Sequence, residues 1–259
     1  MKSIEIEGDR VPALGFGTWE LTGRTCREAV ADALAIGYRH IDTAQGYDNE
    51  EEVGRAIAES DVDRTGIFVT TKIAPHNLDF QRVLRSTEES LRRLRTDYID
   101  LLLIHWPNPE VPLEESLGAM MRLKDEGRIR HIGVSNFSIG LLTEALRLAP
   151  VVCNQVKYHP LLDQGEMLEF VRHHGLMLTA YSPLGRGHVR SEPVLQEIGR
   201  RHDREPAQVA LRWLMQQERV AAIPKAADPD HRRSNLRIFD FELSPEEMER
   251  IASLSHLRV

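Results

Sequence analysis

The sequence predicts an α/β protein in which residues 1–259 form a single domain, a (β/α)8 TIM barrel with a short N-terminal β-hairpin and extra helices near the C-terminus. Three observations support this fold. Eight short runs of β-type residues recur along the chain, each is followed by a longer segment with helical periodicity, and no obvious linker interrupts them. Because βαβ crossovers are right-handed and wrap one way round, eight such units favour a closed parallel barrel.

The expected strands are short apolar runs that precede the helical segments. They are Ala13–Phe16, Tyr38–Ile41, Ile67–Thr71, Tyr98–Ile104, Ile129–Val134, Val151–Asn154, Leu176–Ala180 and Val220–Ile223. Between them, spacings of three to four residues, as in Val30, Ala33 and Leu34, predict one apolar stripe on each helix. The last helix should begin at Ser244, where Ser-Pro-Glu-Glu supplies an N-cap, a proline at the first helical position and a capping-box glutamate.

An open doubly wound sheet is the alternative architecture. That fold usually carries a glycine fingerprint for a dinucleotide after its first strand. Here only Gly15-Phe16-Gly17 stands at that point, which is a weak match. The closed barrel is therefore the favoured interpretation.

Bulk composition excludes several classes of partner. A chain of 259 residues that is 41% hydrophobic can bury a large core, and its net charge of -7 creates no field that attracts nucleic acid or an anionic membrane. The apolar run Ile99–Trp106 is too short to span a bilayer, and the N-terminus lacks a signal-like segment. Cys26 and Cys153 fall in different predicted elements, which suits a reducing compartment. We expect a cytoplasmic monomer.

Polar residues follow the expected strands at the barrel rim. In chain order they are Thr18-Trp19, Asp42, Lys72, His105, Ser135-Asn136, Gln155, Tyr181-Ser182 and Lys225. The carboxyl ends of barrel strands form the active-site face of this fold. We therefore expect Asp42, Lys72 and His105 to meet in one pocket, with Tyr47 on the loop above them.

This quartet is suited to placing a proton on a developing alkoxide. A phenol has an ordinary pKa of about 10, so Tyr47 needs a nearby cation to stabilise its phenolate, and Lys72 could supply it. Asp42 would hold the ammonium, while His105 could donate a second hydrogen bond to the substrate oxygen. Hydride transfer to carbon with proton transfer to oxygen would complete the reduction of a carbonyl.

Other interpretations of these residues remain open. Asp42 could cap a turn, His105 could be a core histidine, and Lys72 could extend to the surface. A metal site built from His40, His105, His131 and Asp42 is less favoured, because His40 and His131 precede or begin strands and no His-x-x-x-His or Cys-x-x-Cys spacing occurs. We expect no metal.

One long segment carries a specific family resemblance. Gly37–Glu50, which reads GYRHIDTAQGYDNE, closely resembles a signature of the aldo-keto reductase family. Further matches follow at Leu101–Pro107, Gly133–Phe137, Asn154-Gln155, Tyr181–Gly185 and Ile223–Lys225. The likeness runs from Val11 to about Leu254 and is greatest to the small bacterial reductases of the 2,5-diketo-D-gluconate and methylglyoxal type.

The resemblance assigns roles to residues at matching positions. It implies a catalytic tetrad of Asp42, Tyr47, Lys72 and His105. It implies a nicotinamide cofactor, with NADP(H) favoured and NAD(H) possible, held by Thr18, Asp42, Ser135, Asn136, Gln155, Tyr181, Ser182, Leu184, Gly185, Lys225, His231 and Asn235. It implies a small-molecule carbonyl substrate, namely an aldehyde, an α-dicarbonyl or a keto sugar, against Trp19, Tyr47, His105 and Trp106.

The chain departs from the family pattern where the 2'-phosphate of NADP(H) is bound. Ala226 replaces the usual serine, His231 the usual arginine and Ser234 the usual glutamate. A neutral His231 would weaken the preference for NADPH over NADH, because a fixed bidentate cation is missing. Three basic residues could compensate, namely Lys225, Arg232 and Arg233.

The chain stops at Val259, soon after its last expected helix. Family members with a longer tail use it to close the substrate pocket, so we expect an open pocket and broad selectivity. Two other functions stay open: a nicotinamide-binding sensor or accessory subunit with little turnover, and a barrel hydrolase or isomerase without nicotinamide.

Overall fold

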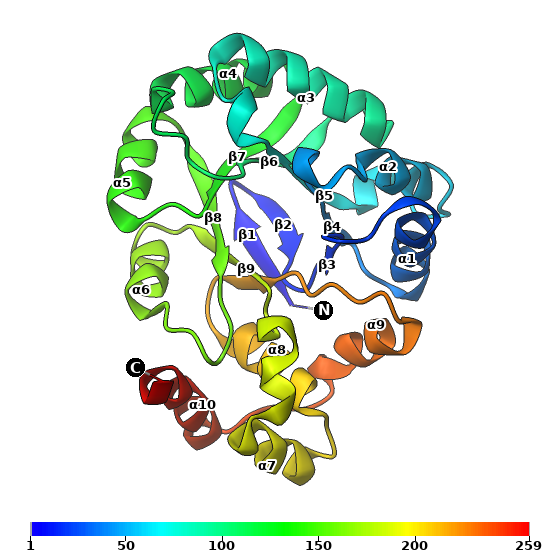
Figure 1. Cartoon of the computed structure of the whole chain (residues 1–259), viewed down its shortest axis with the longest axis vertical. Helices are drawn as coiled ribbons and strands as arrows, with labels where there is room; N and C mark the ends of the chain where they lie inside the picture. Colours follow the sequence, from blue (N-terminus) through cyan, green and yellow to red (C-terminus); the bar gives the residue numbers. More distant parts are fainter. Residues whose placement is uncertain (1, 259) are drawn as a thin grey trace.

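The computed structural model describes residues 2–258 and, beyond Ser255, the backbone alone. Eight parallel strands form one sheet in which each strand is hydrogen-bonded to the next in chain order. Figure 1 shows the strands at the centre of the molecule with helices outside them. They are β3 (Phe16–Gly17), β4 (His40–Asp42), β5 (Phe68–Ile73), β6 (Ile99–Ile104), β7 (Ile129–Ser135), β8 (Val151–Lys157), β9 (Met177–Tyr181) and β10 (Val220–Ala222).

The sheet closes on itself between its first and last strands. Leu14 forms a parallel bridge with Ala222, the amide of Gly15 donates to the carbonyl of Ala222 over 2.8 Å, and that of Ala222 donates to Ala13 over 2.8 Å. At this seam a Cβ on Gly17 would lie 2.6 Å from the carbonyl oxygen of Ile223, so only glycine allows the close approach. The predicted (β/α)8 barrel is confirmed.

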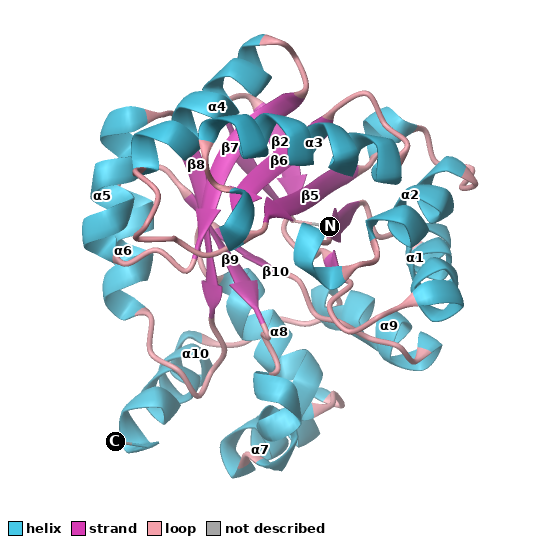
Figure 2. Cartoon of the chain, turned by 45° about the horizontal axis from the view of Figure 1, so that its top comes forward, coloured by secondary structure: helices cyan, strands magenta, loops and turns pink. Residues whose placement is uncertain are grey.

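Helices alternate with the strands and surround the barrel, as Figure 2 shows. They are α1 (Gly23–Ile36), α2 (Glu50–Ala58), α3 (Phe80–Leu94), α4 (Leu113–Asp125), α5 (Ile139–Leu148), α6 (Gly165–His173), α7 (Pro193–His202), α8 (Pro206–Gln216), α9 (Pro229–Leu236) and α10 (Pro245–Ala252). The expected stripe of Val30, Ala33 and Leu34 on α1 is buried. Helix α10 begins after Ser244, and both halves of its capping box are formed as predicted.

Strand bounds differ from the predicted ones by up to three residues, and the differences at the first and third strands of the barrel bear on the site. The first was expected at Ala13–Phe16, but regular pairing covers only β3 (Phe16–Gly17), and Leu14 joins through its isolated bridge. Strand β5 continues to Ile73, so Lys72 lies inside the strand instead of after it. Its side chain is fully buried.

The amino-terminal end of the barrel is covered by an antiparallel hairpin, β1 (Ser3–Ile6) with β2 (Asp9–Pro12). His131, near the start of β7, contacts Glu7 at 2.8 Å and Asp9 at 2.9 Å, one carboxylate on each ring nitrogen. His40, at the start of β4, contacts the carbonyl oxygen of Pro12 at 3.1 Å. His40 and His131, which were considered as metal ligands, therefore join the hairpin to the barrel. The hairpin covers only this end, and the carboxyl end of the barrel stays open.

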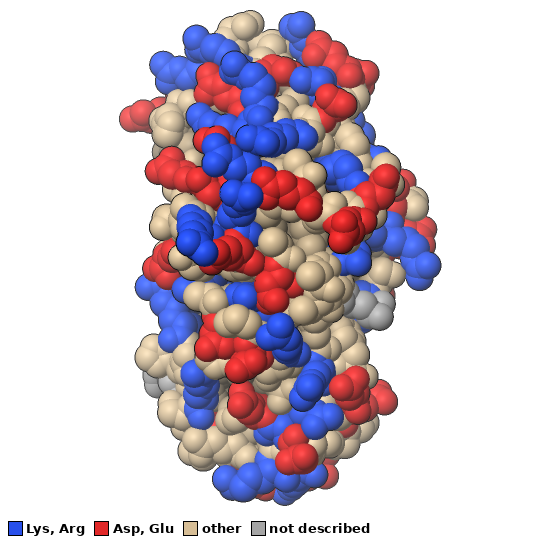
Figure 3. Space-filling model, turned by 90° about the vertical axis from the view of Figure 1, so that its right-hand side faces the viewer, with Lys and Arg blue, Asp and Glu red and all other residues tan. Residues whose placement is uncertain are grey.

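Several other expectations concern the surface and the thiols. No helix within residues 2–258 combines the length and the apolar character that a membrane span needs. Lysine and arginine side chains are interspersed with acidic ones on the face in Figure 3. Cys26 and Cys153 are both free and buried, as expected, and burial raises the pKa of each to about 12.

Candidate active site

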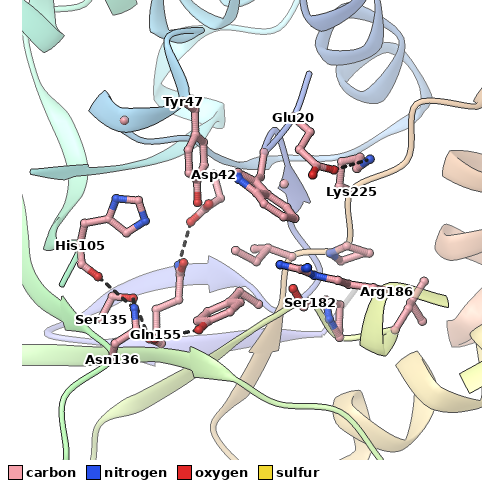
Figure 4. Close-up of a pocket in the computed structure, with 18 of the residues that line it drawn as sticks. Glu20, Asp42, Tyr47, His105, Ser135, Asn136, Gln155, Ser182, Arg186 and Lys225 are labelled. Carbon is pink, nitrogen blue, oxygen red and sulfur yellow. Dashed lines mark hydrogen bonds and ion pairs between the residues drawn. The ribbon is translucent and has the colours of Figure 1, made fainter. Parts of the chain in front are cut away.

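A cleft of 670 Å³ lies at the carboxyl ends of the barrel strands. Asp42 reaches it from the end of β4, Ser135 from the end of β7 and Tyr181 from the end of β9. Tyr47 and His105 come from the loops that follow β4 and β6 (Figure 4). The structure thus brings these side chains together in one cavity at the strand ends.

Lys72 lies beneath the cleft and is paired with Asp42. Its Nζ is 2.5 Å from Oδ1 of Asp42, 2.8 Å from the carbonyl oxygen of Thr43 and 3.3 Å from the hydroxyl of Tyr47. Burial disfavours the ammonium, but attraction by Asp42 and Tyr47 outweighs it, so the pKa of Lys72 is raised. A fixed positive charge therefore lies directly behind the phenol.

Asp42 is held on both of its carboxylate oxygens. Oδ1 accepts from Lys72, and Oδ2 accepts from Nε2 of Gln155 at 2.8 Å. Its backbone oxygen accepts from the amide and the hydroxyl of Thr18, each at 3.0 Å. A buried carboxylate with these partners is satisfied and has little freedom to move.

Tyr47 ends a short 3-10 turn, η1 (Gln45–Tyr47), whose position is fixed by a buried glutamine. Oε1 of Gln45 accepts from the amide of Ala74 at 3.0 Å, and its Nε2 donates to Ser90 at 3.2 Å. This ties the loop that carries the phenol to the end of β5. Tyr47 therefore has a defined place relative to Lys72.

The net pKa shift of Tyr47 differs from the sequence-based expectation. Lys72 lowers the pKa as expected, but burial raises it more, so the net pKa of the phenol is above its ordinary value. The consequence is a hydroxyl that stays protonated at neutral pH and has a cation in place for the phenolate that proton loss would leave.

His105 follows β6 and lies beside the phenol, with its ring centroid 5.5 Å from that of Tyr47 and the planes at 78°. Burial, helped by the charge of Lys72, lowers the pKa of His105 to about 4. The imidazole is therefore neutral at pH 7 and carries one N–H. It can donate one hydrogen bond to a substrate oxygen without adding a second cation.

Amides and hydroxyls form the side of the cleft next to these residues (Figure 4). Nδ2 of Asn136 donates to the carbonyl oxygen of His105 and to Oγ of Ser135, both at 3.0 Å, and Oδ1 accepts from the hydroxyl of Tyr181 at 2.8 Å. Ser135 donates to the carbonyl oxygen of Gln155 at 2.8 Å. Asn136 has φ of +63°, which asparagine tolerates better than most residues. The wall suits a flat ring that bears an amide.

Three cations also line the cleft. Arg186, in the 3-10 segment η4 (Gly185–Ser191), has its guanidinium carbon 5.0 Å from the ring centroid of Trp19. Lys225 lies 3.4 Å from a carboxylate oxygen of Glu20, and Arg190 lines the same cavity. Positive groups along an elongated cleft suit a ligand that carries phosphates.

Five residues expected at the cofactor or in the tetrad do not line the cleft, namely Thr18, Lys72, Gly185, His231 and Asn235. The side chain of Thr18 is fully buried, and its hydroxyl donates to the carbonyl oxygen of Asp42. Gly185 is buried as well, and its amide donates to the carbonyl oxygen of Ser182 within the turn. Lys72 contacts Asp42 and Tyr47, and these two residues line the cleft. Leu184 and Ser182 line it as expected.

His231 and Asn235 lie on α9, beside two smaller cavities that continue the cleft. Arg232 and Arg233, two of the three residues that could compensate for the missing arginine, both lie beside Asp32. Arg232 is buried, 2.7 Å from Asp32, and also donates to the carbonyl oxygens of residues 226 and 227. Arg233 lies 3.4 Å from Asp32. Both side chains are thus already paired within the protein.

Sequence reasoning missed several residues of the cavity: Gly17, Glu20, Gly46, Pro183, Arg186, Gly187, Arg190, Ile223 and Pro224. A signal for Arg186 and Arg190 was present in the segment Ser182–Arg190, where basic residues and glycines follow a strand end. Its conformation depends on positive φ at Ser182 and Arg186. That local backbone cannot be read from apolar periodicity.

The chain belongs to the aldo/keto reductase family, whose model matches residues 13–256. It is 42% identical over 252 residues to an aldo-keto reductase of Mycobacterium sp. (strain KMS), covering 96% of this chain and 91% of that one. It is 41% identical over 249 residues to methylglyoxal reductase DkgB of Escherichia coli O157:H7, covering 94% and 93%.

Solved structures agree with this membership. A crystal structure named for 2,5-diketo-D-gluconic acid reductase B superposes with a TM-score of 0.96 at 45% identity, covering 98% of this chain and 91% of that one. The thermostable aldo-keto reductase Tm1743, in complex with the inhibitor epalrestat, gives a TM-score of 0.93 at 43% identity, covering 98% and 100%. The resemblance that the sequence motifs carried is confirmed, and it supports the reduction of carbonyl compounds. Members of the family generally use nicotinamide cofactors.

Proposed function

We propose that this protein reduces small aldehydes, α-dicarbonyls or keto sugars to alcohols with NADP(H), with NAD(H) as a weaker alternative. One observation carries the proposal. The hydroxyl of Tyr47 faces the cleft 3.3 Å from the ammonium of Lys72, which is itself 2.5 Å from Asp42. His105 completes the tetrad. The same four residues are predicted from the strand ends and from the family resemblance.

The donor set of the cleft fits a nicotinamide dinucleotide. Ser135, Asn136 and Gln155 offer hydroxyl and amide groups for the carboxamide, and the ring of Tyr181 beside them can stack on the nicotinamide. Further along the cleft, Ser182, Leu184, Arg186 and Lys225 would meet the pyrophosphate, and His231 and Asn235 the adenosine half. When bound, the cofactor supplies a hydride to the substrate carbon.

The chain's own residues supply the proton and stabilise charge. The substrate oxygen would lie between the hydroxyl of Tyr47 and an N–H of His105. As negative charge develops on this oxygen, Tyr47 transfers its proton to it, and Lys72 stabilises the resulting phenolate. Asp42 keeps the ammonium in place. The neutral state of His105 suits a donor whose proton stays on the ring.

The substrate end of the cleft is aromatic and open. Trp19 is 38% exposed and Trp106 50% exposed, which is unusual for tryptophan and suits contact with a small substrate. Relatives named for methylglyoxal and for 2,5-diketo-D-gluconic acid reduction support this class of carbonyl. Because the residues that line the cleft come from one chain, we propose that a monomer is sufficient for activity.

The test removes only the proton donor. In Tyr47→Phe the ring remains and the hydroxyl is lost, so we expect turnover with methylglyoxal to fall ~10²–10⁴-fold, the usual contribution of a general acid. NADPH binding, followed by quenching of cofactor fluorescence, should stay within about two-fold of wild type. Near-normal turnover would contradict the proposal. Cofactor binding by the wild type without turnover across a panel of carbonyls would favour the sensor.

A further inference from the structure

The cleft continues away from Tyr47 into two further cavities near α9. The first, of 40 Å³, shares three residues with the main cleft: Leu184, Arg190 and Lys225. The second, of 540 Å³, shares three residues with the first: Glu205, His231 and Ser234. A dinucleotide with its nicotinamide near Tyr47 would therefore place its adenosine half beside these shared residues.

Arg190 stands at the junction of these cavities. It is exposed, comes from η4, and its Nη2 lies 3.3 Å from Nε2 of His231 on α9. An arginine carries only N–H donors, so His231 accepts this hydrogen bond at Nε2. The contact holds the guanidinium at the cleft and leaves its remaining N–H groups free to bind a ligand.

The other cations nearby already have carboxylate partners. Lys225 lies 3.4 Å from Glu20, and Arg232 lies 2.7 Å from Asp32. Arg233 also contacts Asp32, at 3.4 Å. Within residues 2–258, by contrast, no carboxylate lies within ion-pair distance of Arg190. Arg190 thus has its full charge available for an anion.

Four acidic residues also line these cavities, namely Asp203, Glu205, Asp228 and Asp230, and two of them are engaged as helix caps. The carboxylate of Asp228 accepts from the amides of Asp230 and His231 at 2.7 and 3.3 Å, and Glu205 takes part in the capping box of α8. Asp230 lies 3.7 Å from Arg233. The repulsion of an anion by Glu205, Asp228 and Asp230 is therefore partly offset by the N–H groups and the arginine that they face.

We propose that Arg190 binds the 2'-phosphate of NADP(H), and that His231 orients Arg190 for this contact. The inference rests on the proposed function and deepens it. In the family this charge comes from an arginine at the position of His231. Here the guanidinium comes from a different element, the segment η4 after β9, and can make a bidentate contact with a phosphate. The protein thereby keeps a preference for NADPH over NADH.

The experiment compares ligands that differ only in the 2'-phosphate. Dissociation constants for NADPH and NADH are measured by fluorescence, and those for adenosine 2',5'-bisphosphate and 5'-AMP by calorimetry. In Arg190→Gln we expect NADPH and adenosine 2',5'-bisphosphate to bind ~10–100-fold more weakly, the range for hydrogen bonds to a charged group. NADH and 5'-AMP should change by less than about two-fold.

A matched control and a rescue make the result specific. Arg186→Gln removes a cation from the same loop but at the expected pyrophosphate, so it should weaken NADPH and NADH equally. Adding His231→Arg to Arg190→Gln should restore NADPH binding, because the guanidinium is then supplied from α9. Exposed Arg190 should tolerate glutamine, and circular dichroism checks that the variant is folded.

The outcomes separate this inference from the proposed function. A wild type that binds neither NADPH nor NADH overturns both. A wild type that binds NADPH, with an Arg190→Gln variant that loses affinity for NADPH and NADH alike or for neither, overturns the role of Arg190 alone. A loss confined to the 2'-phosphorylated ligands supports it.

Discussion

The two ends of the barrel use the same kinds of side chain to opposite effect. At the amino-terminal end, His131 contacts two carboxylates from the hairpin, Glu7 and Asp9, and each ring nitrogen has a partner. At the carboxyl end, His105 lies beside a cleft with a lysine beneath it, and burial lowers its pKa to about 4. A histidine with satisfied nitrogens stabilises the fold, whereas one that faces a cavity next to a fixed charge is available for chemistry.

The largest expected effect is at the carboxyl end, in Lys72→Met. Removing the ammonium leaves Asp42 buried without its ion pair, so we expect the free energy of unfolding to fall by about 3–5 kcal/mol. Turnover should fall ~10²–10⁴-fold, because the phenolate of Tyr47 loses its cation. Chemical denaturation and steady-state kinetics measure the two effects.

The double variant Lys72→Met with Asp42→Asn separates them. It contains neither buried charge, so stability should return close to wild type while turnover stays low. If turnover recovered together with stability, the ion pair would have only a structural role. The charged groups at the carboxyl end would then stabilise the fold alone, as those at the hairpin end do.

At the amino-terminal end the expected effect is smaller and affects stability alone. His131→Phe keeps the stacking of ring 131 on Phe68, whose centroid is 6.4 Å away, but loses both carboxylate contacts. We expect a loss of about 1–3 kcal/mol in the free energy of unfolding, with turnover within about two-fold of wild type. A large loss of turnover in a variant that remains folded would mean that the two ends are coupled.

Much of this contrast could be predicted from the sequence. The barrel followed from apolar runs of regular length, and Asp42, Tyr47 and His105 were placed at the cleft because strand ends in this fold share one face. Lys72 was expected at that face, but β5 extends past it and its side chain is buried under the cleft.

Other features depend on backbone detail that apolar patterns do not encode. The hydroxyl of Thr18 turns inward to the carbonyl oxygen of Asp42. Arg186 and Arg190 reach the cleft through a loop with positive φ at Ser182 and at Arg186 itself. The contact between Arg190 and His231 joins residues 41 positions apart. Long-range contacts made by loops require the folded structure.

A pH-dependent effect on stability sharpens the comparison further. The ordinary pKa of histidine is about 6.5, and in the folded protein that of His105 is about 4 because burial disfavours the imidazolium. The unfolded chain therefore binds a proton more readily than the folded one. The contribution of His105 to stability is complete above about pH 6.5 and is lost as the pH falls towards about 4.

The variant His105→Gln isolates this contribution, because glutamine does not titrate and other acid-sensitive groups, such as Glu7, are unchanged. Between neutral pH and about pH 4.5, wild type should lose more of its free energy of unfolding than the variant does, as measured by urea denaturation. Equal losses in the two proteins would mean that His105 accepts a proton in the folded state as easily as in the unfolded chain. His105 would then be a cation near pH 5 next to Lys72, and its role as a neutral donor would be wrong at that pH.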